Sequence, residues 1–250
     1  MPVALLDGAE PYRASSGPDG VLLLHGLTGT PHSLRRVAYC LADAGFSVEL
    51  PLLPGHGTTV EDLARTGFDD WAAAAEQALA DLEARCDRVV VGGLSMGGTL
   101  ACELAERHDE LAGLVLVNPL VQPPAERAVA SLREALEAGA DRLPAIGSDI
   151  ASGDVREVAY DALPTAALVS LLEASRAVAD ALVRIRCPVL LFSSRVDHVV
   201  PTDSGDLVEA AVAGPVERVH LEHSYHVATL DHDAGEIEAR VVGFVQKVLA

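Results

Sequence analysis

The sequence predicts an α/β fold in which helices flank a mostly parallel central sheet. Short apolar runs alternate with segments of helical spacing from about residue 20 to residue 117 and again from residue 188 to the C-terminus. The runs are apolar throughout, which is typical of parallel strands whose two faces are both covered by helices. With 250 residues, half of them hydrophobic, the chain is long enough for one domain of this kind.

Strands and helices alternate through the first half of the chain. The apolar runs predict strands over residues 21–24, 46–50, 88–91 and 111–117. Helical spacing predicts helices over residues 33–44, 70–84 and 99–107. Gly45 and Pro51 end two of these elements, and Asp69 and Asp70 are interpreted as N-caps of the second helix.

The alternation stops after Asn118 and Pro119. Residues 120–182 contain no segment with the pattern of a strand, and helices are expected over 125–137, 154–161 and 164–182. Strands then return over 188–193 and 216–221, with helices over 203–213 and 234–249. We therefore expect one domain, residues 1–250, with a helical cap or lid inserted at about 120–182. The alternative is that the inserted helices form only another packing layer.

Charge and cysteine usage narrow the class of protein. The net charge of −19 disfavours binding to nucleic acid or anionic lipid and fits a neutral or apolar small molecule as partner. The first 20 residues lack the pattern of a signal peptide, and no apolar run is long enough to span a membrane. Four widely spaced cysteines favour free thiols over disulfides. We expect a cytoplasmic protein without stable membrane insertion, as a monomer or homodimer.

One serine lies between the predicted strand 88–91 and the predicted helix 99–107. The segment Gly93-Leu94-Ser95-Met96-Gly97 matches G-x-S-x-G, the pattern of a nucleophile elbow. Ser95 would occupy a strained turn, and glycines two residues away on each side would let the strand and the helix approach closely. An ordinary serine in a glycine-rich turn is the alternative, so the interpretation depends on partner groups elsewhere in the chain.

A nucleophilic serine needs a base, and the base needs an acid that orients it. In enzymes with this elbow, the acid and then the histidine follow the serine along the chain. Asp197 comes just after the strand 188–193, at the edge where catalytic groups of parallel sheets gather. Asp203 and Asp206 fit better in the first turn of the next helix. Asp197 is therefore the predicted acid.

The candidates for the base are the histidines that follow the last predicted strand. Sequence position favours His226 but leaves His223 and His232 open. His25 and His56 precede the serine and are interpreted as structural imidazoles that brace turns. No cluster of histidines, cysteines or acidic residues has metal-ligand spacing, so we expect no metal and no cofactor.

An oxyanion hole requires backbone N–H groups that already point at the developing charge. One is expected from Met96, directly after the serine, and the second from Leu27, in the glycine-containing loop after the first strong strand. The acidic residues of the segment 231–233 are interpreted as caps of the final helix.

Seven segments together resemble the bacterial monoacylglycerol lipase and carboxylesterase group of the α/β-hydrolases. They are HGLTGTPHSLR (25–35), LPGHGT (53–58), GLSMGG (93–98), IGSD (146–149), DVREVAY (154–160), DHVVP (197–201) and SYHVATLD (224–231). The resemblance selects His226 as the base. It implies an α/β-hydrolase fold and a serine esterase that cleaves monoacylglycerols to glycerol and fatty acid through an acyl-enzyme on Ser95. The family often has an aromatic residue where this chain has Leu27, which leaves the acyl preference open.

The same resemblance implies two substrate contacts in the insertion. Ile146 is expected in an apolar wall and Glu157 at a substrate hydroxyl, although both also fit purely structural roles. Two other functions stay open at this point. A general short-chain carboxylesterase or a thioesterase could use the same three residues, and a ligand receptor could retain the fold without turnover.

Overall fold

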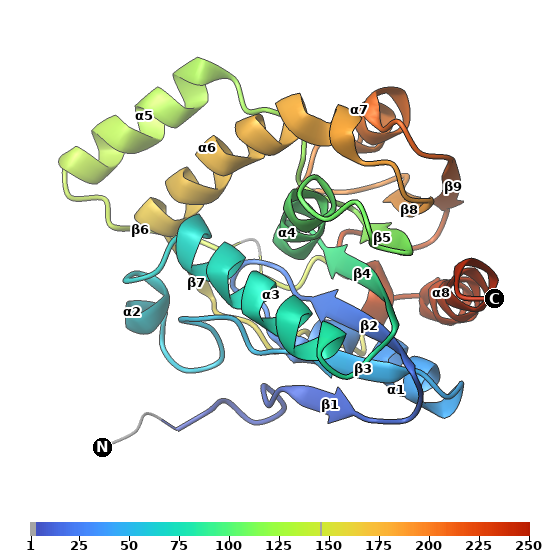
Figure 1. The fold of residues 1–250 in the computed structure, drawn as a ribbon. Helices are drawn as coiled ribbons and strands as arrows, with labels where there is room; N and C mark the ends of the chain where they lie inside the picture. The colour runs from blue at the N-terminus through green and yellow to red at the C-terminus, as the bar shows by residue number, and fades with distance from the viewer. Residues whose placement is uncertain (1–3, 146) are drawn as a thin grey trace.

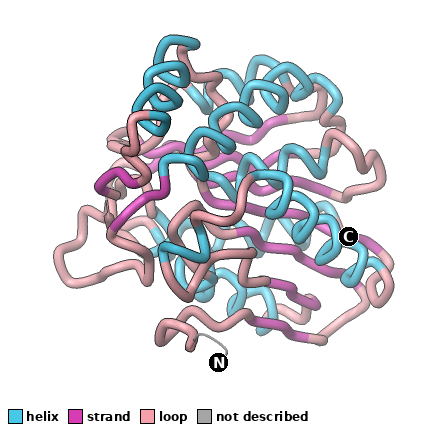
Figure 2. Tube along the Cα trace, turned by 90° about the vertical axis from the view of Figure 1, so that its left-hand side faces the viewer, coloured by secondary structure: helices cyan, strands magenta, loops and turns pink. Residues whose placement is uncertain are grey.

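A computed structural model describes residues 4–145 and 147–250 of the protein. Its seven-stranded sheet has the order β1-β3-β2-β4-β5-β8-β9, with β1 antiparallel to β3 and the other pairs parallel. The strands are β1 (Tyr12–Ala14), β2 (Asp19–Leu24), β3 (Ser47–Leu50), β4 (Arg88–Leu94), β5 (Gly113–Val117), β8 (Val189–Ser194) and β9 (Val216–Leu221). The strands lie side by side and loops gather beyond their ends (Figure 2). The predicted parallel sheet is confirmed.

Helices cover both faces of this sheet (Figure 1). On one face lie α1 (Arg35–Asp43) and α8 (Ala234–Val248), and on the other lie α3 (Phe68–Glu83), α4 (Met96–Ala105), α6 (Thr165–Ala181) and α7 (Ser204–Ala211). Shorter helical segments are η1 (Pro31–Leu34), α2 (Val60–Leu63), η2 (Leu182–Arg184) and η3 (Ala228–Leu230). The arrangement is a three-layer sandwich.

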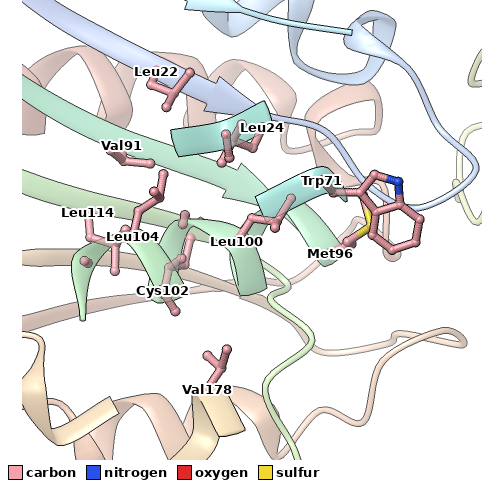
Figure 3. Close-up of a cluster of buried hydrophobic side chains, with 14 of the residues drawn as sticks. Leu22, Leu24, Trp71, Val91, Met96, Leu100, Cys102, Leu104, Leu114 and Val178 are labelled. Atoms are coloured by element: carbon pink, nitrogen blue, oxygen red, sulfur yellow. The ribbon is translucent and has the colours of Figure 1, made fainter. Parts of the chain in front are cut away.

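Side chains alternate along the strands between two clusters of buried residues. Leu22, Leu24 and Val91 pack on the side of α3, α4 and α6, whereas Val21 and Val90 pack on the side of α1 and α8. Figure 3 shows the first cluster, in which α4 lies between the sheet and α6. Because the central strands are apolar on both faces, they are buried on both faces, as the continuous apolar runs predicted.

The chain from 120 to 182, which we call the insert, runs between β5 and β8. It contains α5 (Glu126–Glu137), the two-stranded sheet of β6 (Arg142–Pro144) and β7 (Ala162–Pro164), and then α6, and it ends at the start of η2. The helix α6 packs on α4 through buried side chains, while α5 lies against α6, on the far side from the sheet (Figure 1).

Two predictions for the insert are wrong. The strands β6 and β7 were not expected, because three-residue strands are too short to give a periodic pattern. Residues 154–161 form turns rather than a helix. The backbone N–H groups there bond outside the segment, with Glu157 donating to Ser148 Oγ (2.7 Å) and Tyr160 to the carbonyl of Thr28 (3.0 Å).

Two helix starts also differ from the predicted ones. Gly67, not an aspartate, is the N-cap of α3, and Asp70 accepts a hydrogen bond from the Gly67 N–H at 2.9 Å from within the first turn. Asp69 lies in the same turn. The helix begins earlier because Phe68 is already buried against the core. The helix after the serine begins at Met96, so no loop separates it from Ser95.

The described residues include no helix that is long and apolar enough to cross a membrane. Over the same ranges the four cysteines are free, which confirms the prediction of thiols over disulfides.

Candidate active site

Ser95 is held at the junction of β4 and α4 in strained backbone geometry. Its φ of 56° and ψ of −118° lie outside the regions that side chains other than glycine usually adopt. A Cβ on Gly93 would overlap the carbonyl group of Gly97, and a Cβ on Gly97 would overlap the carbonyl group of Leu24. The two glycines of the motif therefore permit the close approach that we predicted, and the turn presents Ser95 at the carboxyl edge of the sheet.

His226 and Asp197 form a nearly buried pair in the loops after β9 and β8. His226 Nδ1 lies 2.7 Å from Asp197 Oδ2, and the two side chains are 6% and 3% exposed. The N–H groups of Val199 and Val200 donate to Asp197 Oδ1, each at 2.8 Å. Burial alone would raise the pKa of Asp197, but the His226 hydrogen bond and charge, together with these N–H groups, outweigh it and lower the pKa. The carboxylate therefore stays ionised and accepts a hydrogen bond from the His226 Nδ1–H.

Asn118, at the end of β5, holds the peptide of His226 from one side. Its Nδ2 donates to the His226 carbonyl group at 2.8 Å, and its Oδ1 accepts the Ser194 N–H at 2.8 Å. Asn118 has a φ of 43°. No role was predicted for Asn118 from the sequence, although an Asn-Pro pair directly after a buried strand is a signal that could have singled it out.

Asp231 and Asp233 have other roles than the predicted capping of the last helix. Asp231 accepts backbone N–H groups from Ala151, Ser152, Tyr225 and His232. Asp233 stands at the N-cap position of α8, but its side chain makes no cap hydrogen bond and instead accepts the His223 N–H at 3.0 Å. The capping prediction is wrong because these carboxylates satisfy donors of the loop that carries His226 and, for Asp231, of the insert as well.

The loop after β2 runs directly beside Ser95. A Cβ built on Gly26 would lie 3.5 Å from the Ser95 Cβ, and the next residue, Leu27, lines the same cavity as Ser95. His25 fixes this loop, because its Nε2 accepts the Leu53 N–H at 3.1 Å and its Nδ1 lies 3.0 Å from the Gly26 carbonyl oxygen. Burial, with the neighbouring His56, lowers the pKa of His25 to about 3, so the ring is neutral. The structural role predicted for His25 is confirmed.

A cavity of about 160 Å³ joins these groups. Ser95, His226, Leu27 and Glu157 all line it, and its apolar wall comes mainly from leucines of the insert: Leu163, Leu168, Leu171 and Leu172. Asp197 lies behind His226. The side chain of Met96 is buried in the core. Ile146 lies outside the described residues.

Glu157 brings a carboxyl group into this largely apolar space. Burial raises its pKa to about 7, against the opposing influence of His226. Near neutral pH the group is therefore divided between its acid form, which donates a hydrogen bond, and its ionised form, which accepts one.

A second group of polar side chains lies away from the cavity. The ligand atoms of Glu83, His108 and Glu110 come within 4.8 Å of one another. His108 is already paired with Glu76 at 2.9 Å and with Glu110 at 3.1 Å, and both glutamates of the trio are exposed. This group belongs to surface ion pairing.

The family described as Hydrolase_4, serine aminopeptidase S33, matches residues 18–233 of the chain. The chain belongs to this family. The match spans every element from β2 to the loop that carries His226, so the insert lies within it. The family and the α/β-hydrolase fold predicted from the sequence motifs are both confirmed.

Individual relatives in this family are ester hydrolases. A thermostable monoacylglycerol lipase of Bacillus sp. (strain H-257) is 45% identical over 248 residues, covering 97% of this chain and 96% of the lipase. A carboxylesterase of Bacillus subtilis (strain 168) is 24% identical, covering 96% and 97%. A solved structure reported with the metagenome-derived lipolytic enzymes LipS and LipT has a TM-score of 0.93 and 39% identity, covering 98% and 100%.

Proposed function

We propose that this protein is a serine ester hydrolase that cleaves monoacylglycerols to glycerol and fatty acid. The observation that carries the proposal is the cavity, in which Ser95 and His226 line one largely apolar space and Glu157 supplies the only carboxyl group among the described lining residues. The 45% identity to a monoacylglycerol lipase over nearly the whole chain supports the glyceride class.

In the proposed reaction, Ser95 is the nucleophile and His226 the base. His226 Nε2 takes the proton from Ser95 Oγ as the oxygen attacks the ester carbonyl carbon. Asp197 keeps the Nδ1 proton in place and stabilises the imidazolium that forms. His226 then protonates the leaving glycerol oxygen, which breaks the C–O bond and leaves the acyl group on Ser95. Water, deprotonated by His226, releases the fatty acid and regenerates the serine.

The oxyanion of each tetrahedral intermediate is assigned to the N–H groups of Met96 and Leu27. Met96 is the first residue of α4, where backbone N–H groups have no partner within the helix and the helix dipole favours negative charge. Leu27 follows Gly26, which lies against Ser95. Donors fixed in this way need no rearrangement when the charge appears.

The lining of the cavity, apolar except for a few polar groups, suits the apolar and polar parts of a monoacylglycerol. We assign the acyl chain to the leucine wall supplied by the insert, and a glycerol hydroxyl to Glu157. With its pKa raised to about 7, Glu157 serves a hydroxyl as either donor or acceptor. In this proposal the protein is one domain, residues 1–250, and the insert is the cap over its active site. We also propose that it acts in the cytoplasm.

A substrate panel tests the proposal. The purified protein is assayed on monoacyl-, diacyl- and triacylglycerols of matched chain length, on short-chain p-nitrophenyl esters and an acyl thioester, and on an aminoacyl p-nitroanilide, because the family description names an aminopeptidase. We expect the highest kcat/KM on monoacylglycerols, with Ser95→Ala lowering it by at least about 10⁴-fold without unfolding the protein.

Three outcomes of the panel would contradict the proposal. Equal or better turnover of triacylglycerols would exclude the monoacylglycerol preference. A preference for short esters or thioesters would favour a general carboxylesterase or a thioesterase. Tight binding of a monoacylglycerol without any turnover would favour a ligand receptor.

A further inference from the structure

Asp149 of the insert is a buried carboxylate that our sequence analysis quoted only within a motif. It is 8% exposed. Its Oδ2 accepts the backbone N–H groups of His198 at 3.2 Å and of His226 at 3.1 Å, and its Oδ1 lies 2.8 Å from His198 Nδ1. Its own carbonyl group accepts the Val227 N–H at 3.1 Å. One side chain of the insert thus holds both loops that carry the proposed acid and base.

These bonds close a ring around the proposed catalytic pair. Asp197 and His198 are neighbours in sequence, and each pairs across to another segment: Asp197 with the ring of His226, and His198 with Asp149. Asp149 completes the ring by binding the N–H of His226. The His198 ring also packs edge-on against Tyr225, the residue before His226, with ring centroids 4.8 Å apart.

The peptide of His226 is consequently fixed at both its polar groups. Asn118 of β5 binds the carbonyl oxygen, and Asp149 of the insert binds the N–H. The first contact comes from the end of a central strand, whereas the second comes from the insert. Neither contact involves the imidazole ring, whose Nδ1 is bound to Asp197.

We propose that Asp149 is a positioning residue through which the seated insert sets the spacing between the His226 loop and the Asp197 loop. The proposal rests on the proposed function of Ser95, His226 and Asp197. It predicts that removing the Asp149 carboxyl group impairs the chemical step more than substrate binding, because the contact acts on the base and does not line the cavity.

The test compares Asp149→Ala with Asp149→Asn and with a remote control. Asparagine keeps an oxygen that accepts both N–H groups, and its amide can donate to a neutral His198 ring, so it restores the contacts that alanine removes. Glu49 of β3 is the matched control: it is also 8% exposed and also ties separate segments, through Arg13 and Arg85. Each variant is assayed for kcat, KM, melting temperature and rate of Ser95 labelling by a fluorophosphonate.

We expect Asp149→Ala to lower kcat and the labelling rate by about 10- to 100-fold with KM changed less than about threefold, because small misplacements of a catalytic group cost rates of this order. Asp149→Asn should stay within about fivefold of the wild type. Glu49→Ala should lower the melting temperature without lowering kcat. The low-field proton resonance of His226 Nδ1–H should shift or broaden in Asp149→Ala and persist in Asp149→Asn.

A folded Asp149→Ala protein with kcat and labelling rate within about threefold of the wild type would overturn the inference. The inference would also be overturned if Glu49→Ala lost as much kcat as Asp149→Ala at a similar loss of melting temperature. If Asp149→Ala does not fold, Asp149→Ser is compared with Asp149→Asn by the same criterion. A wild-type protein that neither hydrolyses esters nor is labelled at Ser95 would instead contradict the proposed function.

Discussion

The helices α4 and α5 differ sharply in how they are packed, although they are similar in length. Nine of the ten residues of α4 are buried, and none of the twelve residues of α5 is. The helix α4 follows Ser95 and fills the space between the sheet and α6, whereas α5 packs mainly against α6. The proposed nucleophile is thus followed by an almost fully buried helix, whereas α5 supplies none of the described residues that line the cavity, whose leucine wall comes from β7 and α6.

This difference in packing separates the residues proposed for the chemical step from those proposed to select the substrate. A change in α4 must disturb the sheet, because its glycines lie against the backbone of β2 and β4. A change on the outer side of the insert disturbs little, since few contacts depend on it. Only the inner side of the insert, with the cavity leucines, Glu157 and Asp149, reaches the site. The following substitutions test this ordering.

The largest effect is expected from Gly97→Ala in α4. A methyl group there would overlap the carbonyl group of Leu24, so the elbow must move away from β2. We expect a loss of more than about 3 kcal/mol in the free energy of unfolding and at least a 100-fold loss of kcat/KM. Urea denaturation and ester hydrolysis measure the two effects.

Gly243→Ala is the control for this change. Gly243 is exposed in the interior of α8, and a Cβ there meets nothing within 4 Å. The same substitution should therefore stabilise the protein by about 0.5–1 kcal/mol, because alanine favours helix over glycine. If Gly97→Ala lowered neither the free energy of unfolding nor kcat/KM, the close packing described for the elbow would be contradicted.

A second comparison lies within the insert, between Leu171→Ala in α6 and Leu132→Ala in α5. Leu171 is 1% exposed and lines the cavity, whereas Leu132 is only partly buried. We expect a loss of about 3 kcal/mol for Leu171→Ala and less than about 1 kcal/mol for Leu132→Ala. Leu171→Ala should also shift the acyl-chain preference toward longer chains. Equal losses of stability, or an unchanged chain-length profile, would contradict the claim that only the inner side of the insert shapes the site.

The carboxyl group of Glu157 should make stability depend on pH. Its pKa is about 7 in the folded protein against an ordinary value of 4.5, so the folded state binds more protons between these values. Stability therefore falls as pH rises from about 4.5 to 7, by roughly 3 kcal/mol at most. Glu157→Gln should lack this fall, so its advantage over the wild type should grow between pH 5 and pH 8. If stability varied with pH in the same way for both proteins, burial would not raise the pKa of Glu157.

The smallest effect is expected from Ala130→Gly in α5. This residue is exposed, so only helix propensity is lost, at a cost of about 1 kcal/mol or less. Kinetic constants on monoacylglycerols should not change. A measurable loss of kcat would mean that the outer helix is coupled to Ser95 after all.

Patterns in the sequence predicted the parts of the fold whose information is local. The strands β2, β4, β5 and β8 are continuous apolar runs, and the elbow glycines are required by contacts within a few residues of Ser95 or with the adjacent strand. Chain order then led to Asp197 and, with the resemblance to a family, to His226. These two side chains do meet, with 2.7 Å between Nδ1 and Oδ2.

The parts that could not be predicted depend on contacts between distant segments. Asp231 looked like a helix cap because it precedes α8, but its carboxylate is held by donors about 80 residues away in the insert. The segment 154–161 has helical composition, but its N–H groups are bound elsewhere. Asp149 stands in one of the quoted motifs, but its role could not be predicted because its partners come from the loops after β8 and β9.

The most direct test of the account is the intact mass of the protein after reaction with a fluorophosphonate. We predict one adduct per chain, located on Ser95 by peptide mapping, with esterase activity lost in proportion to the labelled fraction, and no adduct on Ser95→Ala. Full activity in a protein labelled at Ser95, or stoichiometric labelling of another residue with loss of activity, would contradict the central claim that Ser95 is the nucleophile.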